Sequence, residues 1–113
     1  MCREKLILIW LSGDKRAAMD MAMLYARDCL LNRWFKRVRF FIWGPTVQLA
    51  ATDVDIQTEI ALMQRVGVEV AACIACASSY GVVEDLRALG IAVRGLGDEL
   101  SSELACGTPS VVI

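Results

Sequence analysis

The chain has 113 residues, enough for one domain with a single hydrophobic core and too few for two. Its net charge of −1 provides no general field for nucleic acid or an anionic membrane surface. It contains no histidine, which excludes histidine acid–base catalysis, Ser-His and Cys-His dyads, and zinc sites with imidazole ligands. Hydrophobic residues make up 57% of it, so part of the apolar surface is expected to be covered by another subunit.

The chain is expected to be cytoplasmic and to make no membrane contact. Its first apolar run, residues 6–11, is too short for a transmembrane helix or the core of a signal peptide. Thiols are kept reduced in the cytoplasm. The five cysteines, an odd number at irregular spacings, do not resemble the disulfide framework of a secreted protein.

The first predicted elements are a buried strand and a long apolar helix. Residues 5–11 form a continuous run of β-favouring side chains, which predicts a strand covered on both faces. A polar segment ends this strand, and a helix is predicted over residues 15–32. Apart from a stripe of Arg16, Asp20 and Arg27, nearly all of its residues are apolar, so the helix is apolar around most of its circumference. This pattern is a second indication of oligomerisation.

The middle of the chain predicts another strand, a short helical turn and an amphipathic helix. The second strand covers residues 37–43 and stops at Gly44 and Pro45, and Pro45 opens a turn that runs to residue 50. Thr52, followed by Asp55, predicts the N-terminal cap of the next helix, and Gly67 predicts its end. A third strand is then predicted over residues 68–72.

The remaining segments continue the alternation of helix and strand. Short helices are predicted over residues 73–80 and 83–89, a strand over 91–93, a helix over 98–105 and a last strand over 110–113. The alternation predicts an α/β fold for residues 1–113, with a single three-layer, flavodoxin-like domain and a mainly parallel five-stranded sheet.

Three loops of such a sheet are candidates for a ligand site, because ligands bind outside the carboxyl ends of parallel strands where the strand order reverses. The candidate substrate-binding residues are Ser12, Gly13, Asp14, Lys15, Trp43, Gly44, Pro45, Ser79 and Tyr80. In the flavodoxin-like order 2-1-3-4-5, the reversal falls between the first and third strands. The loop of residues 12–15 would then face the end of the third strand directly.

Two thiols, Cys73 and Cys76, are the candidate catalytic residues. Cys73 ends the third strand and begins a short helix, and Cys76 lies one turn further along the same face. Free N–H groups and the dipole at a helix start favour a thiolate, and Lys15 would add to this effect if it faced the loop. Cysteine is also among the most buried residue types, and that structural interpretation is kept for Cys2, Cys29 and Cys106.

Other chemistry has weaker support in the sequence. The basic residues Arg33, Lys36, Arg37 and Arg39 alternate with aromatic residues, as in some nucleic-acid interfaces, but they are interpreted as charges at the end of a helix. Residues 12–15 match no phosphate-binding loop. A zinc site would need two ligands besides the thiol pair. No cofactor, metal or nucleic acid is therefore expected.

The thiol segment resembles that of a known family. Cys73-Ile-Ala-Cys76, followed by Ser79-Tyr80-Gly81-Val82, is similar to the thiol loop of the DsrE/DsrF-like family, in which a glycine follows the cysteine at the strand end by eight residues. Segments 9–15, 42–45 and 67–70 are also similar to that family. The resemblance implies a flavodoxin-like fold that assembles into trimers or hexamers. It further implies sulfur relay, with a persulfide carried between partner proteins on the cysteine that matches Cys73.

The resemblance leaves the role of Cys76 open, since CxxC forms belong mostly to branches of the family without an assigned function. Cys76 would resolve a persulfide as a disulfide, assist metal binding or modulate Cys73. The leading hypothesis is a homo-oligomeric, sulfurtransferase-like persulfide carrier with sulfur donor and acceptor proteins as partners. The alternatives are a CxxC dithiol oxidoreductase and a non-catalytic, oligomeric protein that binds a small ligand and has inert cysteines.

Overall fold

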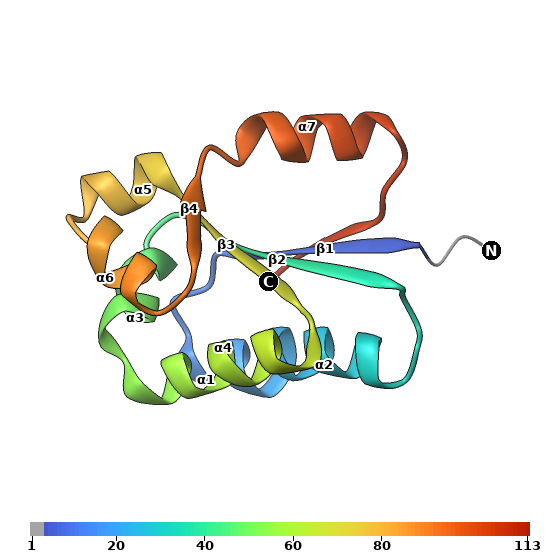
Figure 1. Ribbon diagram of the computed structural model, residues 1–113, viewed down its shortest axis with the longest axis horizontal. Coiled ribbons are helices and arrows are strands. Elements are labelled where there is room, and N and C mark those ends of the chain that lie inside the picture. Colours follow the sequence, from blue (N-terminus) through green and yellow to red (C-terminus); the bar gives the residue numbers. More distant parts are fainter. Residues whose placement is uncertain (1–3) are drawn as a thin grey trace.

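A computed structural model describes residues 4–113 and contains one five-stranded sheet (Figure 1). All strand pairs are parallel, in the order β4-β3-β2-β1-β5. The strands are β1 (Lys5–Trp10), β2 (Arg37–Ile42), β3 (Glu69–Cys73), β4 (Ala92–Arg94) and β5 (Ser110–Val112). The predicted three-layer, flavodoxin-like α/β architecture is confirmed. The strand order 2-1-3-4-5 is wrong, because β2 lies between β1 and β3.

Helices cover both faces of the sheet, but unequally. Helix α7 (Gly97–Ala105) lies alone above it in Figure 1, whereas the other helical elements lie below it or beyond its left end. These other helical elements are α1 (Lys15–Ala17), η1 (Ala18–Met23), α2 (Leu24–Leu31), α3 (Thr46–Thr52), α4 (Val54–Val66), α5 (Ile74–Ser79) and α6 (Val83–Ala88). No helix in residues 4–113 is long and apolar enough to cross a membrane.

The strand order accounts for the isolation of α7. Connections between parallel strands are almost always right-handed. The steps from β1 to β2, β3 and β4 all run in one direction across the sheet, so their helices pack on one face. The chain then returns past β1 to form β5, and a right-handed connection in that direction places α7 on the opposite face.

Each face of the sheet has its own buried cluster. The face toward α2 and α4 buries large side chains from the strands, including Trp10, Phe40 and Ile42, together with Met63 of α4. A smaller cluster lies on the face toward α7. It consists of Ile7, Ile9, Phe41, Ala71, Cys73 and Leu96. The thiol of the third strand thus belongs to the smaller cluster.

The predicted helix of residues 15–32 is one helical segment with an irregular centre. Asp14 caps α1, its carboxylate accepting hydrogen bonds from the N–H groups of Arg16 and Ala17. Six residues, Ala18–Met23, then adopt π-helical geometry before α2 continues as an α-helix. Such insertions are rare and widen the helix by one residue within a turn.

The cap predicted for the next helix is wrong by one residue. Asp53, and not Thr52, precedes α4, and its carboxylate accepts the N–H of Ile56 at 3.0 Å. Thr52 instead ends α3 and donates its hydroxyl to the carbonyl of Gln48. The predicted stop at Gly67 is confirmed, since this residue has a φ of 105°, where a glycine avoids the strain of a side chain.

Candidate thiol site

The two candidate thiols come from the junction of β3 and α5. Cys73 is the last residue of β3 and the N-cap of α5, with extended backbone angles of −69° and 123°. Cys76 is the third residue of that helix. The junction lies at the carboxyl edge of the sheet, but the strand order reverses between β1 and β5, so the rule that places ligands at the reversal does not itself select the end of β3. The predicted strand–thiol–helix arrangement is confirmed.

The two thiols differ in exposure. Cys73 is 7% exposed and belongs to the cluster with Phe41 and Leu96, on the face that α7 covers. Cys76 is half-buried and packs against the clusters of both faces. A reagent from solvent therefore meets Cys76 more readily than Cys73.

The loop after β2 makes direct contact with the thiol pair. The backbone N–H of Gly44 donates a hydrogen bond to Sγ of Cys76 at 3.3 Å. Gly44 has a φ of 67°, a conformation that residues with a side chain rarely adopt. A glycine at this position therefore lets the backbone turn its donor toward the sulfur.

The surroundings of Cys76 act on its titration in opposite directions. Burial raises the pKa of this thiol, because it penalises the charged form, and the neighbouring Cys73 thiol also raises it. The N–H of Gly44 lowers the pKa by stabilising the thiolate, but burial is the larger effect. Cys76 is thus less ionised at neutral pH than an ordinary cysteine.

A buried threonine, missed by the sequence analysis, positions this loop. The hydroxyl of Thr46 is fully buried and lies 2.9 Å from the carbonyl oxygen of Trp10 and 2.8 Å from that of Trp43. It therefore ties the end of β1 to the end of β2. Its position after Gly44-Pro45 did not signal this role, because a threonine at a helix start predicts a bond to helix N–H groups, whereas this hydroxyl lies against two carbonyl oxygens.

The loop of residues 12–15 does not meet the thiols. Because β2 separates β1 from β3, the expectation that this loop faces Cys73 directly is wrong. Lys15 points to the start of α4, where its ammonium lies 2.7 Å from Asp55 and 3.1 Å from Asp53. Hydrogen bonds with these carboxylates, that of Asp55 first, raise the pKa of Lys15.

The other candidate binding residues lie around the thiols to different extents. Ser12 accepts the N–H of Asp14, and this contact closes its own loop beside Gly13. Trp43 packs against the cluster that contains Cys73, and Pro45 is exposed. Ser79 and Tyr80 are exposed at the far end of α5. The structure thus brings the β2 loop, and not the β1 loop, to the thiol pair.

A second residue missed by the sequence analysis is Arg94. It is the register partner of Cys73 on the neighbouring strand β4, so the two side chains leave the same face of the sheet. Its guanidinium donates to Glu99 of α7 through Nε at 2.6 Å and Nη2 at 3.0 Å. The sequence could have indicated this residue. Arg94 directly follows the predicted strand 91–93, and the carboxyl ends of parallel strands lie at the same edge of the sheet as Cys73.

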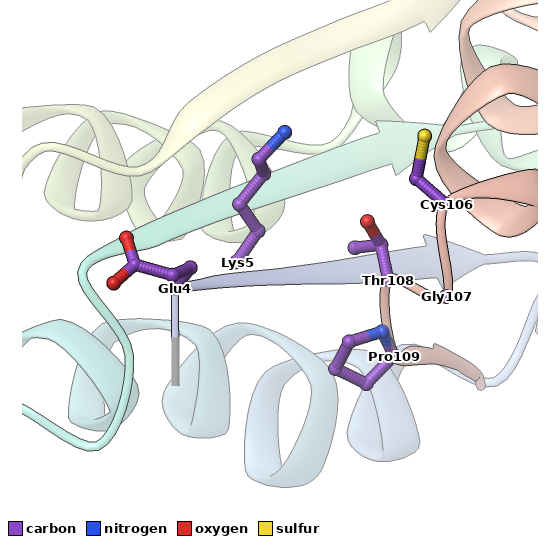
Figure 2. Close-up of a pocket in the computed structure, with 6 residues that line it drawn as sticks. All are labelled: Glu4, Lys5, Cys106, Gly107, Thr108 and Pro109. Carbon is purple, nitrogen blue, oxygen red and sulfur yellow. The ribbon is translucent and has the colours of Figure 1, made fainter. Parts of the chain in front are cut away.

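The sheet has another hollow at its opposite edge (Figure 2). This cavity of about 420 Å³ is lined by Glu4, Lys5, Cys106, Gly107, Thr108 and Pro109. Figure 2 shows the Lys5 and Cys106 side chains extending toward the same side of β1. The Lys5 ammonium pairs with Glu103 at 3.0 Å. Cys106 is exposed, which contradicts the buried interpretation kept for it, and no other thiol of residues 4–113 lines this hollow.

The remaining cysteines and possible metal ligands add no second site. Cys29 is fully buried in the large cluster, as its structural interpretation predicted. Cys2 lies outside the described residues. Within residues 4–113, no group of three or more cysteine or carboxylate side chains is placed to hold a metal ion.

Comparisons with known proteins identify relatives by fold. No family model matches the chain, and no curated protein matches it in sequence. The structure of YchN from E. coli superimposes with a TM-score of 0.72 and 13% identity, covering 99% of this chain and 100% of that one. At this identity the match shows only that the two chains share the same α/β fold.

A second solved structure is much more similar. It is described as a conserved protein of unknown function, BT1422, from Bacteroides thetaiotaomicron. It superimposes with a TM-score of 0.94 and is 33% identical, covering 97% of this chain and 95% of that chain. The chain therefore belongs to the same family as BT1422.

Proposed function

We propose that this chain is a sulfur-relay protein that carries a persulfide on Cys73. The observation that carries the proposal is the pair of thiols at the carboxyl end of β3, with Cys73 at the start of α5 and Cys76 beside the Gly44 N–H. The DsrE-like fold supports it at the level of architecture. The protein would work in the cytoplasm, where its thiols stay reduced.

The proposed loading step is a displacement at sulfur. The Cys73 thiolate, having lost its proton to water, attacks the outer sulfur of thiosulfate. The S–S bond of the donor breaks, sulfite leaves with the electron pair, and a new S–S bond forms on Cys73. Backbone N–H groups at the start of α5 would stabilise the resulting persulfide anion.

Cys76 is proposed as the resolving thiol. Its thiolate would attack Sγ of the Cys73 persulfide, forming a Cys73–Cys76 disulfide and releasing hydrosulfide with the electron pair. The raised pKa of Cys76 supports this order of events, because fewer Cys76 thiolates compete for the donor. A persulfide on Cys73 therefore has time to reach an acceptor protein.

The test is intact-mass measurement after treatment of the reduced protein with thiosulfate or polysulfide. Wild type and Cys76→Ser should gain one sulfur atom, and the Cys76→Ser adduct should persist longer. Cys73→Ser should gain none at this segment. If neither donor adds sulfur to Cys73, or if the adduct forms on Cys76 in Cys73→Ser at the wild-type rate, the proposal is wrong.

A dithiol oxidoreductase is the second candidate, favoured by the contact between the two thiols, which contributes to the raised pKa of Cys76. In that reaction Cys73 and Cys76 would become a disulfide while a substrate disulfide is reduced to two thiols. The reduction potential of the pair and turnover with a small disulfide substrate separate this candidate from sulfur relay.

We also propose that the protein is a homo-oligomer, a trimer or hexamer. Large apolar side chains on one side of η1 and α2 remain exposed in the single chain, among them Met21, Leu24 and Leu31. Together with Trp34 they form an apolar surface of the kind that subunits cover. Light scattering should give a trimeric or hexameric mass, and Leu31→Glu should lower it. A monomeric wild type would contradict the proposal.

A further inference from the structure

Arg94 is placed to act on a ligand of Cys73. The two residues are register partners on adjacent parallel strands, which lie about 4.8 Å apart in such sheets. The side chain of Arg94 is 44% exposed, whereas Cys73 is almost covered. Arg94 therefore presents a guanidinium to solvent on the face of the sheet that carries the thiol.

The hydrogen bonds of Arg94 orient it without using all of its donors. Glu99 accepts from Nε and Nη2, and a guanidinium has five N–H donors in total. Glu99 is also bound by Arg39, whose side chain is 11% exposed, so this carboxylate is shared by two arginines. The carboxylate therefore offsets part of the charge of Arg94 while fixing its direction.

We propose that Arg94 binds the anionic end of the sulfur donor, which is therefore an oxyanionic species of the thiosulfate class. The inference rests on the proposed function. Arg94 is the residue that selects the donor by charge, since the planar guanidinium matches the paired oxygens of a sulfonate-like group. During the displacement at Cys73, its N–H groups hold the sulfite that leaves.

The experiment compares an anionic and a neutral alkylating reagent at the same thiol. Rates of Cys73 alkylation by iodoacetate and iodoacetamide are measured by peptide mass in a Cys76→Ser background. In Arg94→Met the iodoacetate-to-iodoacetamide rate ratio should fall about fivefold, the size expected for an exposed ion pair. Arg94→Lys should keep most of the ratio, and high salt should lower the ratio of the parent protein.

Arg87→Met is the matched control. Arg87 is an arginine of similar exposure, 48%, and pairs with Glu84 on α6 as Arg94 pairs with Glu99. Its substitution should leave the ratio unchanged. Because both reagents need the same access to Cys73, the ratio also corrects for any loosening of α7 in Arg94→Met.

The outcomes separate the inference from the proposed function. An unchanged ratio in Arg94→Met, an equal fall in Arg87→Met, or a Cys73 that neither reagent labels would overturn the role of Arg94. If the ratio falls but neither thiosulfate nor polysulfide leaves sulfur on Cys73, the anion-binding role stands and sulfur relay fails. Loss of the thiosulfate adduct in Arg94→Met, with rescue in Arg94→Lys, supports both.

Discussion

The two faces of the sheet are held by different forces. Helix α4 buries Ile56, Ile60 and Met63 against the large cluster, whereas α7 has no fully buried residue. Polar contacts hold α7 instead, with Glu99 bound by Arg39 and Arg94, and Glu103 bound by Lys5. Apolar burial persists in salt, but exposed ion pairs weaken. The face that carries Cys73 is therefore the more easily opened one.

The two faces should differ most in the stability lost when one apolar side chain of the covering helix is shortened to alanine. Met63→Ala removes a fully buried side chain of α4 and should lower the free energy of unfolding by about 2–5 kcal/mol. Leu100→Ala on α7 removes a half-buried one and should cost much less. Urea denaturation measures both. Equal losses would mean that the two faces are equally well packed.

Removal of the shared carboxylate should open the weaker face. Glu99→Gln leaves the nearly buried Arg39 side chain without its charged partner, which should cost about 1–3 kcal/mol. Cys73 should then react faster with iodoacetamide, because α7 covers its cluster. The control is Glu84→Gln, at an exposed pair on α6. An unchanged Cys73 rate in Glu99→Gln would show that α7 does not limit access.

Acid should loosen α7 before it loosens the centre of α4. Hydrogen bonds from Arg94, and then Arg39, lower the pKa of Glu99, and Lys5 lowers that of Glu103. A carboxyl with a lowered folded-state pKa stabilises above its ordinary value, about 4.3, and loses this contribution as pH falls through the folded value. Amide exchange across this range should show α7 losing protection first. If α7 and the centre of α4 lost amide protection at the same pH, α7 would not be the more weakly held helix.

The smallest predicted effect is a change in the pKa of Cys76, which packs against the clusters of both faces. Cys76 contacts both clusters, and the Cys73 thiol contributes to its raised pKa. In Cys73→Ser the pKa of Cys76 should therefore fall, while burial keeps it above the ordinary value. The pH dependence of Cys76 alkylation by iodoacetamide gives both midpoints. A higher midpoint in the variant would exclude this contribution from Cys73.

The sequence predicted the fold class and the thiol junction because both depend on local patterns. The apolar run of β1, the glycine stop at Gly67 and the strand end at Cys73 are visible within a few residues. The strand order was not predictable in this way. It depends on which strands β3 and β5 pair with, since β3 lies beside β2 and β5 beside β1, and the residues of a short buried strand do not specify its neighbour.

Contacts between residues far apart in the sequence also determine which side chains surround the thiols. The sequence did not show which side chains Lys15 would contact. In the structure its ammonium pairs with Asp53 and Asp55 at the start of α4. Arg94 was not predicted as a neighbour of Cys73, since their pairing joins residues 21 positions apart through the register of β3 and β4. The cover over Cys73 likewise depends on α7 returning across the sheet.

The π-helical stretch Ala18–Met23 has a consequence for how this family can vary. Deleting one residue from it would restore an α-helix and rotate α2 relative to α1 by about 100°. The Asp14 cap and the bond from Lys15 to Asp55 would stay in place, while different side chains of α2 would turn outward. A single-residue length change there would therefore alter which α2 side chains face outward and also turn the buried Ala26 and Cys29 away from the large cluster.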